Sequence, residues 1–225
     1  MIAPCYDPQT WGPSLDAAVH ALSRGEVIVL PTDTVYGVGA DAFQPDAVAR
    51  LLAAKGRGKH MPPPVLIPSV ATVDGLGRDV SAPARALMDA FWPGPLTVIV
   101  WAQLSLAWDL GDTHGTVALR VPDHPAALAL LTRTGPLAVT SANRTGEPAA
   151  TSVEAAQAQL GNAVSLYLDG GDSPLGVAST IIDATGAGLS LVREGGISRA
   201  QLEAVVGAEA FATPAEVTGA QEAGA

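Results

Sequence analysis

Two periodicities of apolar residues alternate along the chain and predict a mixture of strands and helices. Short apolar runs bounded by Gly, Pro or Asp are typical of buried strands, whereas apolar positions three and four residues apart are typical of amphipathic helices. The expected helices cover residues 14–23, 45–54, 82–91 and 125–132. The expected strands cover residues 27–30, 65–67, 96–101, 117–121, 137–139, 165–168, 180–183 and 189–192.

Two further helices are predicted from capping-box spacings, in which a hydroxyl and a Glu or Gln three residues later satisfy backbone N–H groups of the first turn. The pairs are Thr151 with Glu154, for a helix ending near residue 160, and Ser198 with Gln201, for a helix ending near residue 206.

The order of these elements predicts the fold class and the domain boundary. Strands and helices are mixed without a strict strand-helix-strand repeat, which favours an α/β or α+β fold with one twisted mixed sheet flanked by helices. We expect a single folded domain over residues 1–206. Residues 207–225 are rich in Ala, Glu, Gly and Thr, with Phe211 as the one large apolar residue, and this composition predicts a disordered tail.

Composition supports a folded, non-membrane protein. Apolar residues make up 48% of the chain and charged residues 15%, which is enough for a core, while no apolar run approaches the roughly 20 residues that span a bilayer. No secretory or transit signal is evident at the N-terminus, so the cytoplasm is the expected compartment. The single cysteine, Cys5, predicts neither an internal disulfide nor a thiolate metal site.

The charge balance narrows the class of ligand. The formal net charge is −10, from 22 acidic and 12 basic residues, which disfavours stable direct binding of a nucleic acid. The densest group of cations comprises Lys55, Arg57, Lys59 and His60. Because cations are scarce elsewhere, we expect this group to meet a small anionic molecule.

Two polar segments follow predicted elements at places where a ligand could bind. Residues 31–39 combine hydroxyls and glycines directly after a buried strand, where α/β proteins place ligands; the alternative is an ordinary turn in which Thr32 and Asp33 bond their own backbone. Residues 55–64 join the cations to glycines and three prolines. Arg offers a fork for phosphate or carboxylate and Lys a point charge; the alternative is a solvated surface loop.

A third polar segment contains Ser141 and Asn143, two residues apart after the strand at 137–139, so both side chains can face one side. They could bind a carboxylate or phosphate; the alternative is an Asx turn. The chain has no Gly-x-Ser-x-Gly elbow, P-loop or Gly-x-Gly-x-x-Gly turn, which excludes the usual serine hydrolase, NTPase and dinucleotide classes. The four histidines lack metal-ligand spacing, and we expect no protein-bound metal.

Together these segments form part of an ordered series of six motifs. They are residues 31–39, Lys55-x-Arg57 with the following prolines, 91–97 (Phe-Trp-Pro-Gly-Pro-Leu-Thr), 116–122, Ser141-x-Asn143 and 179–183. On this series, over roughly residues 14–206, the chain resembles the YrdC-like threonylcarbamoyl-AMP synthases, in the short form without an additional C-terminal domain.

The resemblance implies an activity. Members of this family, as nucleotidyltransferases, condense L-threonine, bicarbonate and ATP, with Mg²⁺ accompanying ATP, to threonylcarbamoyl-AMP and pyrophosphate. A separate transferase machinery then uses the adenylate to form N6-threonylcarbamoyladenosine (t6A37) in tRNA. Two alternatives remain open at this stage: a related enzyme that forms another carbamoyl-adenylate, and a non-catalytic RNA-binding module.

The resemblance also implies roles for particular residues, position by position. The implied catalytic residues are Lys55, Arg57, Ser141 and Asn143. The implied threonine-binding residues are Thr34, Arg120 and Ser179. The implied ATP-binding residues are Arg57, Thr116, Ser141, Asn143, Thr151 and Arg193. The family often has Asn-Pro-Leu and then a His after the basic loop, whereas this chain continues through residues 62–66 to Pro68.

Overall fold

A single mixed β-sheet organises the part of the chain that the computed structural model describes, residues 1–212 of 225. Its strand order is β1-β9-β2-β3-β8-β4-β7-β6-β10-β11, and β5 pairs with β6 outside this path. The strands are β1 (Ile2–Pro4), β2 (Ile28–Leu30), β3 (Gly37–Asp41), β4 (Val65–Leu66), β5 (Gly77–Arg78), β6 (Leu96–Ala102), β7 (Thr116–Arg120), β8 (Leu137–Ser141), β9 (Leu166–Asp169), β10 (Thr180–Asp183) and β11 (Ser190–Arg193).

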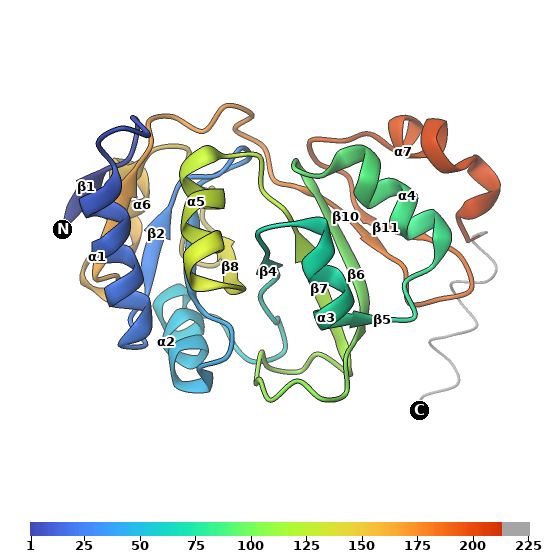
Figure 1. Ribbon diagram of the computed structural model, residues 1–225, viewed down its shortest axis with the longest axis horizontal. Helices are drawn as coiled ribbons and strands as arrows, with labels where there is room; N and C mark the ends of the chain where they lie inside the picture. Colours follow the sequence, from blue (N-terminus) through green and yellow to red (C-terminus); the bar gives the residue numbers. More distant parts are fainter. Residues whose placement is uncertain (213–225) are drawn as a thin grey trace.

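Helices flank this sheet, as Figure 1 shows. They are α1 (Gly12–Ser23), α2 (Pro45–Lys55), α3 (Val73–Leu76), α4 (Ala82–Phe91), α5 (Pro125–Thr134), α6 (Val153–Leu160) and α7 (Arg199–Val206). In Figure 1, α1, α2 and α5 lie over the half of the sheet that contains β2, while α4 and α7 lie over the half that contains β6 and β10. The predicted fold class, a single domain with a twisted mixed sheet and flanking helices, is confirmed.

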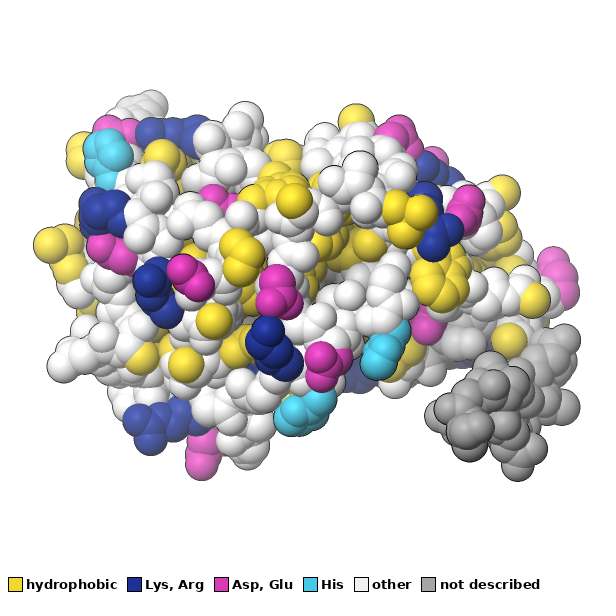
Figure 2. Space-filling model, turned by 90° about the horizontal axis from the view of Figure 1, so that it is seen from below, with side chains coloured by type: hydrophobic (Ala, Val, Ile, Leu, Met, Phe, Trp, Pro, Cys, Tyr) yellow, Lys and Arg dark blue, Asp and Glu magenta, His cyan; other side chains and the backbone are white. Residues whose placement is uncertain are grey.

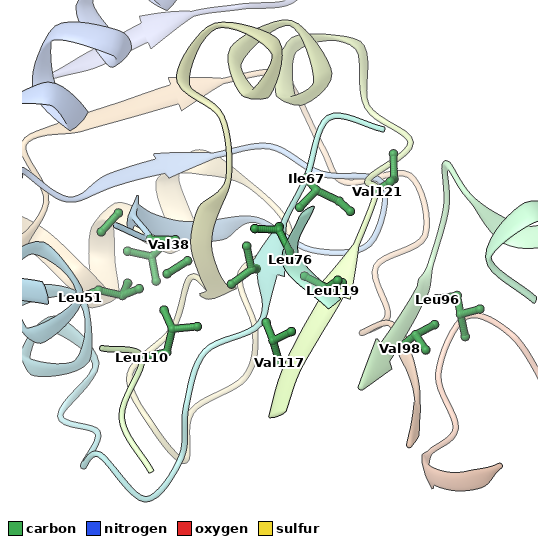
Figure 3. Packing of buried hydrophobic residues seen from close by; sticks show 14 of the residues in the cluster. Val38, Leu51, Ile67, Leu76, Leu96, Val98, Leu110, Val117, Leu119 and Val121 are labelled. Carbon is green, nitrogen blue, oxygen red and sulfur yellow. The ribbon is translucent and has the colours of Figure 1, made fainter. Parts of the chain in front are cut away.

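Two hydrophobic clusters lie on the two faces of the sheet. On β2, Ile28 and Leu30 belong to the smaller cluster, beneath α1 and α5, whereas Val29 belongs to the larger one. This division follows from the two-residue period of a strand, which sends neighbouring side chains to opposite faces. Figure 3 shows part of the larger cluster, with Leu51 on α2 and Val38 on β3. Burial on both faces explains why β2 appears in the sequence as an uninterrupted apolar run.

Strand β3 was not predicted from the sequence. Residues 37–41 form β3, which pairs antiparallel with both β2 and β8. The ligand-binding loop predicted over residues 31–39 therefore ends before residue 37 and is shorter than expected. Glycine is required here by close packing: a Cβ on Gly37 or Gly39 would lie 2.6 or 2.9 Å from a methyl group of Val139. Because glycines disfavour strands locally, the pattern pointed to a loop, and tertiary pairing overrides it. The short strands β1 and β5 were also not predicted.

The two capping boxes have different outcomes. The Ser198 and Gln201 pair forms as predicted at the start of α7, with both reciprocal hydrogen bonds present. At α6 the prediction was wrong by one residue. Ser152 is the N-cap, and its hydroxyl accepts a hydrogen bond from the backbone N–H of Ala155 at 3.3 Å.

The folded domain extends beyond the boundary predicted at residue 206. Phe211 is only 5% exposed and belongs to the larger hydrophobic cluster, and Leu189 forms a parallel β-bridge with it. The guanidinium carbon of Arg199 lies 3.7 Å from the centre of its ring. Residues 207–212 are therefore packed against the domain, and the rest of the predicted tail, 213–225, lies outside the described residues. No helix within residues 1–212 has the length and apolar character needed to cross a membrane.

The packing of Phe211 leads to a stability prediction. Replacing Phe211 with Ala removes a buried ring and should lower the free energy of unfolding by about 3 to 5 kcal/mol. The control is Val205→Ala on the exposed side of α7, where Val205 is 42% exposed and the change should stay within about 0.5 kcal/mol. Urea unfolding followed by circular dichroism measures both. Equal stability of the two variants would mean that Phe211 is not part of the core.

Candidate active site

A cavity of about 510 Å³ brings together the three polar segments singled out in the sequence. Its wall includes Thr34 after β2, Arg57 after α2, and Ser141 and Asn143 at the end of β8. Strands β6, β7, β10 and β11 contribute the opposite side, with Thr97, Thr116, Arg120, Ile181 and Arg193. Residues that are far apart in the chain thus meet at one concave site, which is the expected form of a small-molecule site.

The cavity wall carries more positive than negative side chains. The charged residues that line it are Arg57, Arg120, Arg193 and Glu147. Three positive and one negative group give a local charge of +2, in contrast to −10 for the whole chain. On the molecular face shown in Figure 2, acidic and basic side chains are interspersed and form no continuous basic stripe. The concentration of arginines therefore favours an anionic ligand of small size.

Arg57 presents unpaired donors inside the cavity. The left-handed backbone of Gly56 (φ 63°) ends α2, and the N–H of Arg57 donates to Leu52 O at 2.9 Å. The guanidinium donates from Nη1 to Thr140 Oγ1 at 3.1 Å, whereas Nε is buried and has no partner among the described residues. Burial lowers the pKa of Arg57, but a guanidinium remains charged. Nη2 makes no hydrogen bond among the described residues and is not among the buried atoms, so it is the donor of Arg57 that a ligand in the cavity could use.

Arg120 is held by a buried network that includes two residues of the segment after β2. Its Nε donates to Gly94 O at 3.0 Å and its Nη1 to Thr34 Oγ1 at 2.9 Å. Its Nη2 pairs with Asp33 Oδ1, which also accepts the backbone N–H of Asp123 at 3.0 Å. Burial lowers the pKa of Arg120, and the Asp33 carboxylate counteracts that shift. The structure thus brings the predicted residues Thr34 and Arg120 together, and it adds Asp33 beside them.

Ser179 and Arg193 are also adjacent. The Nε and Nη2 groups of Arg193 donate to Ser179 O at 3.1 and 2.7 Å, and Nη2 also reaches Ser179 Oγ at 3.3 Å. The hydroxyl of Thr97 lies 2.9 Å from the same Oγ. Thr97 is the last residue of the motif at 91–97, and the sequence did not predict it as a site residue. Thr116, another predicted residue, lines the cavity and donates from Oγ1 to Thr113 O at 2.8 Å.

Two predicted site residues do not lie on the cavity wall. Lys55 is 4% exposed, and its ammonium faces the backbone oxygens of Ser141, at the end of β8, and of Asn143 just after it. Burial, with Arg57 nearby, lowers its pKa to about 8. Thr151 lies outside the lining, and its carbonyl accepts the N–H of Ser173 at 2.8 Å. Lys59 pairs with Asp109 at 3.0 Å on the surface. Of the three Lys and Arg residues in the predicted basic cluster, only Arg57 reaches the cavity wall.

Comparison with known proteins places this geometry in a family. The model of Sua5, YciO and YrdC proteins, described as telomere recombination, matches residues 20–195. The chain belongs to the Sua5/YciO/YrdC family. A Mycobacterium tuberculosis (strain H37Rv) relative, named as a candidate threonylcarbamoyl-AMP synthase, is 48% identical over 206 residues, which are 92% of this chain and 95% of that protein. The threonylcarbamoyl-AMP synthase of Bacillus subtilis is 39% identical and is matched over 87% of this chain and 57% of its own length.

Solved structures of the family share the fold. Pyrococcus abyssi Sua5 in complex with L-threonine has a TM-score of 0.88 at 32% identity, over 96% of this chain and 63% of that chain. Escherichia coli YciO has a TM-score of 0.77 at 27% identity, over 88% of this chain and 96% of that chain. The single domain described here therefore corresponds to nearly all of YciO and to somewhat less than two thirds of Sua5.

Within residues 1–212 of this family member, no group of three or more His, Cys, Asp or Glu residues could hold a metal ion. Glu147 is the one carboxylate among the described residues that line the cavity.

The buried pair of Asp33 and Arg120 leads to a second stability prediction. Asp33→Asn leaves the Arg120 cation, whose side chain is 8% exposed, without its counter-charge and should cost about 3 to 5 kcal/mol. The matched control is Asp16→Asn, because Asp16 pairs with Arg133 on the surface, where the side chains are 60% and 41% exposed and the change should cost less than about 1 kcal/mol. Chemical denaturation of both variants measures the loss in the free energy of unfolding. A cost for Asp33→Asn no larger than for the control would show that Arg120 does not depend on Asp33.

Proposed function

We propose that this protein is an L-threonylcarbamoyladenylate synthase, a nucleotidyltransferase that condenses L-threonine, bicarbonate and ATP to threonylcarbamoyl-AMP and pyrophosphate. The observation that carries the proposal is the meeting of three arginines with threonine and serine hydroxyls in one cavity. The support from relatives is the name of the B. subtilis protein and the L-threonine complex of P. abyssi Sua5.

The amino acid is assigned to the part of the cavity around Arg120. A guanidinium has five N–H donors, and three of those on Arg120 are used by Gly94, Asp33 and Thr34, so two remain for a carboxylate. The hydroxyls of Thr34 and Ser179 complete this subsite. Because Arg120 is held by a buried network before the ligand arrives, little side-chain entropy is lost when threonine binds.

The triphosphate is assigned to Arg57, Arg193 and Ser141, with Thr116 on the same wall. Arg193 binds Ser179 through Nε and Nη2, which leaves Nη1 for a phosphate oxygen. That contact supports a nucleotide subsite directly beside the amino-acid subsite. Thr151 and Asn143 remain predicted nucleotide contacts, whereas Lys55, which the resemblance implied to be catalytic, is buried and lies off the cavity wall.

The reaction can proceed by positioning and charge stabilisation. The threonine amine attacks bicarbonate and, with loss of water, forms a carbamate. A carbamate oxygen then attacks the α-phosphorus of ATP in line, and the bond to the departing pyrophosphate breaks. The arginines stabilise the negative charge that develops on the α-phosphate and the pyrophosphate. No covalent enzyme intermediate is required. Mg²⁺ enters as part of the MgATP substrate, and Glu147 is the available carboxylate on the wall.

In the cell, the adenylate is proposed to pass to a separate transferase machinery that forms t6A37 on tRNA, and the expected compartment is the cytoplasm. Stable direct binding of tRNA by this chain is not part of the proposal, since its net charge is −10.

Direct detection of the product tests this function. The full chain is incubated with MgATP, bicarbonate and L-threonine, and threonylcarbamoyl-AMP is sought by mass spectrometry together with threonine-dependent pyrophosphate. Carbamoyl phosphate in place of threonine and bicarbonate tests the related carbamoyl-adenylate chemistry. Pyrophosphate release that needs carbamoyl phosphate, or no release at all, would reject the proposal.

Arg57→Lys should impair this reaction. Loss of the guanidinium fork at a buried phosphate site should cost about 2 to 4 kcal/mol of transition-state stabilisation, on the order of 30- to 1,000-fold in rate. Arg85→Lys is the control, because Arg85 pairs with Asp74 at the surface. Steady-state pyrophosphate release and thermal melting are measured on both. Near wild-type activity of Arg57→Lys would remove the basic loop from the site, and a parallel loss of stability would make Arg57 a structural residue.

Discrimination between threonine and serine should be modest. The two amino acids differ by one methyl group, whose burial is worth about 1 kcal/mol, or roughly fivefold in kcat/KM. Competition between the two amino acids, with both adenylates quantified by mass spectrometry, measures the ratio. Equal rates would show that the pocket does not enclose the methyl group.

A further inference from the structure

The ammonium group of Lys55 already has a full set of partners inside the protein. Its Nζ lies 2.5 Å from Ser141 O, 2.6 Å from Asn143 O and 3.2 Å from Asn143 Oδ1. An ammonium carries three protons and each has an acceptor here. All three acceptors belong to Ser141, the last residue of β8, and Asn143, two residues further on.

The side chain of Asn143 is also fully engaged. Its Nδ2 donates to Arg144 O at 2.9 Å and to Glu147 O at 2.7 Å, while its Oδ1 faces Lys55. The backbone N–H of Thr145 returns a hydrogen bond to Lys55 O at 3.0 Å. We call residues 141–147 the β8 loop. Lys55 and Asn143 together tie this loop to the C-terminal end of α2.

These contacts determine what the β8 loop can present to the cavity. The carbonyls of Ser141 and Asn143 converge on one cation, which offsets the repulsion between two oxygens that would otherwise be buried side by side. Ser141 and Glu147 lie at the two ends of the loop, and both line the cavity. A phosphate contact by Lys55 would require its ammonium to leave these oxygens without a donor in a buried place, which is unfavourable.

We propose that Lys55 and Asn143 are positioning residues that hold the β8 loop in its binding geometry, and that Lys55 contacts neither ATP nor threonine but acts through Ser141. The inference rests on the proposed function for its catalytic consequence. This tie of the β8 loop to α2 is present in the ligand-free protein, so it can be tested without an activity assay.

The first experiment is hydrogen exchange on the ligand-free full chain. Lys55→Met should raise the exchange rate of the β8-loop amides at Asn143, Thr145 and Glu147 by roughly tenfold or more, because the loop loses its anchor. Lys59→Met is the matched control on the same basic loop: Lys59 pairs with Asp109 at the surface, so β8-loop exchange should stay at the wild-type level. Unchanged exchange in Lys55→Met overturns the tie, whatever reaction the protein catalyses.

Asn143→Asp provides a second variant if Lys55→Met does not fold. The carboxylate can still accept from Lys55, but it cannot donate to Arg144 O and Glu147 O. Faster β8-loop exchange in this variant, with the Lys55 contact retained, supports the role of Asn143 in holding the loop in its geometry. Wild-type exchange overturns the assignment of Asn143 as a positioning residue.

The second experiment is a double-mutant cycle on threonylcarbamoyl-AMP formation. If Lys55 acts through Ser141, Lys55→Met should lower kcat/KM no more than Ser141→Ala does, and adding it to Ser141→Ala should cost less than about threefold more. Multiplying losses would overturn the claim that Lys55 does not contact the substrates. If the wild type forms no adenylate, the proposed function fails, while the exchange experiment still decides the tie.

Discussion

The buried ion pair between Arg120 and Asp33 is the interaction on which the geometry of the cavity depends. Arg120 ends β7, in the half of the sheet that contains β6, and Asp33 follows β2 in the other half. Their side chains are 8% and 7% exposed, so each buried charge depends on the other to offset its loss of hydration. Replacing such a pair with apolar residues is often neutral or stabilising. We therefore interpret this pair as fixing an arginine in place for a ligand rather than as a source of stability.

The sheet topology explains how so many polar side chains reach the same cavity. Strand β3 pairs with β2 and β8, so the segment that leaves β2 lies next to the end of β8. Strands β4 and β7 continue the sheet from β8 towards β6 and β10, which carry Thr97 and Ile181 on the opposite wall. Each segment is rigidly attached to a buried strand. Preorganised donors of this kind suit a reaction in which charge shifts between phosphate groups.

The lysine and arginine side chains at and near the cavity therefore have different roles. Arg57 and Arg193 lie on the cavity wall with donors available, and Arg120 is locked but keeps two. Lys55 is enclosed by backbone oxygens, and Lys59 pairs with a surface carboxylate. Arginine is suited to the cavity because its charge survives burial and its planar fork serves two acceptors at once. A lysine suits the enclosed position because its three protons point in different directions.

The sequence by itself determined most elements of the fold and the three segments of the site, because apolar periodicity, caps and glycine-rich turns act over a few residues. The helix at α4, the strand β10 and the capping box of α7 are all local, and all were predictable. Tertiary structure alone decided that residues 37–41 form a strand under Val139 and that Phe211 is buried. It also decided which partners Arg120 and Lys55 take, 87 and 88 residues away at Asp33 and Asn143. Such pairings depend on the register and order of the strands, which no short-range pattern encodes.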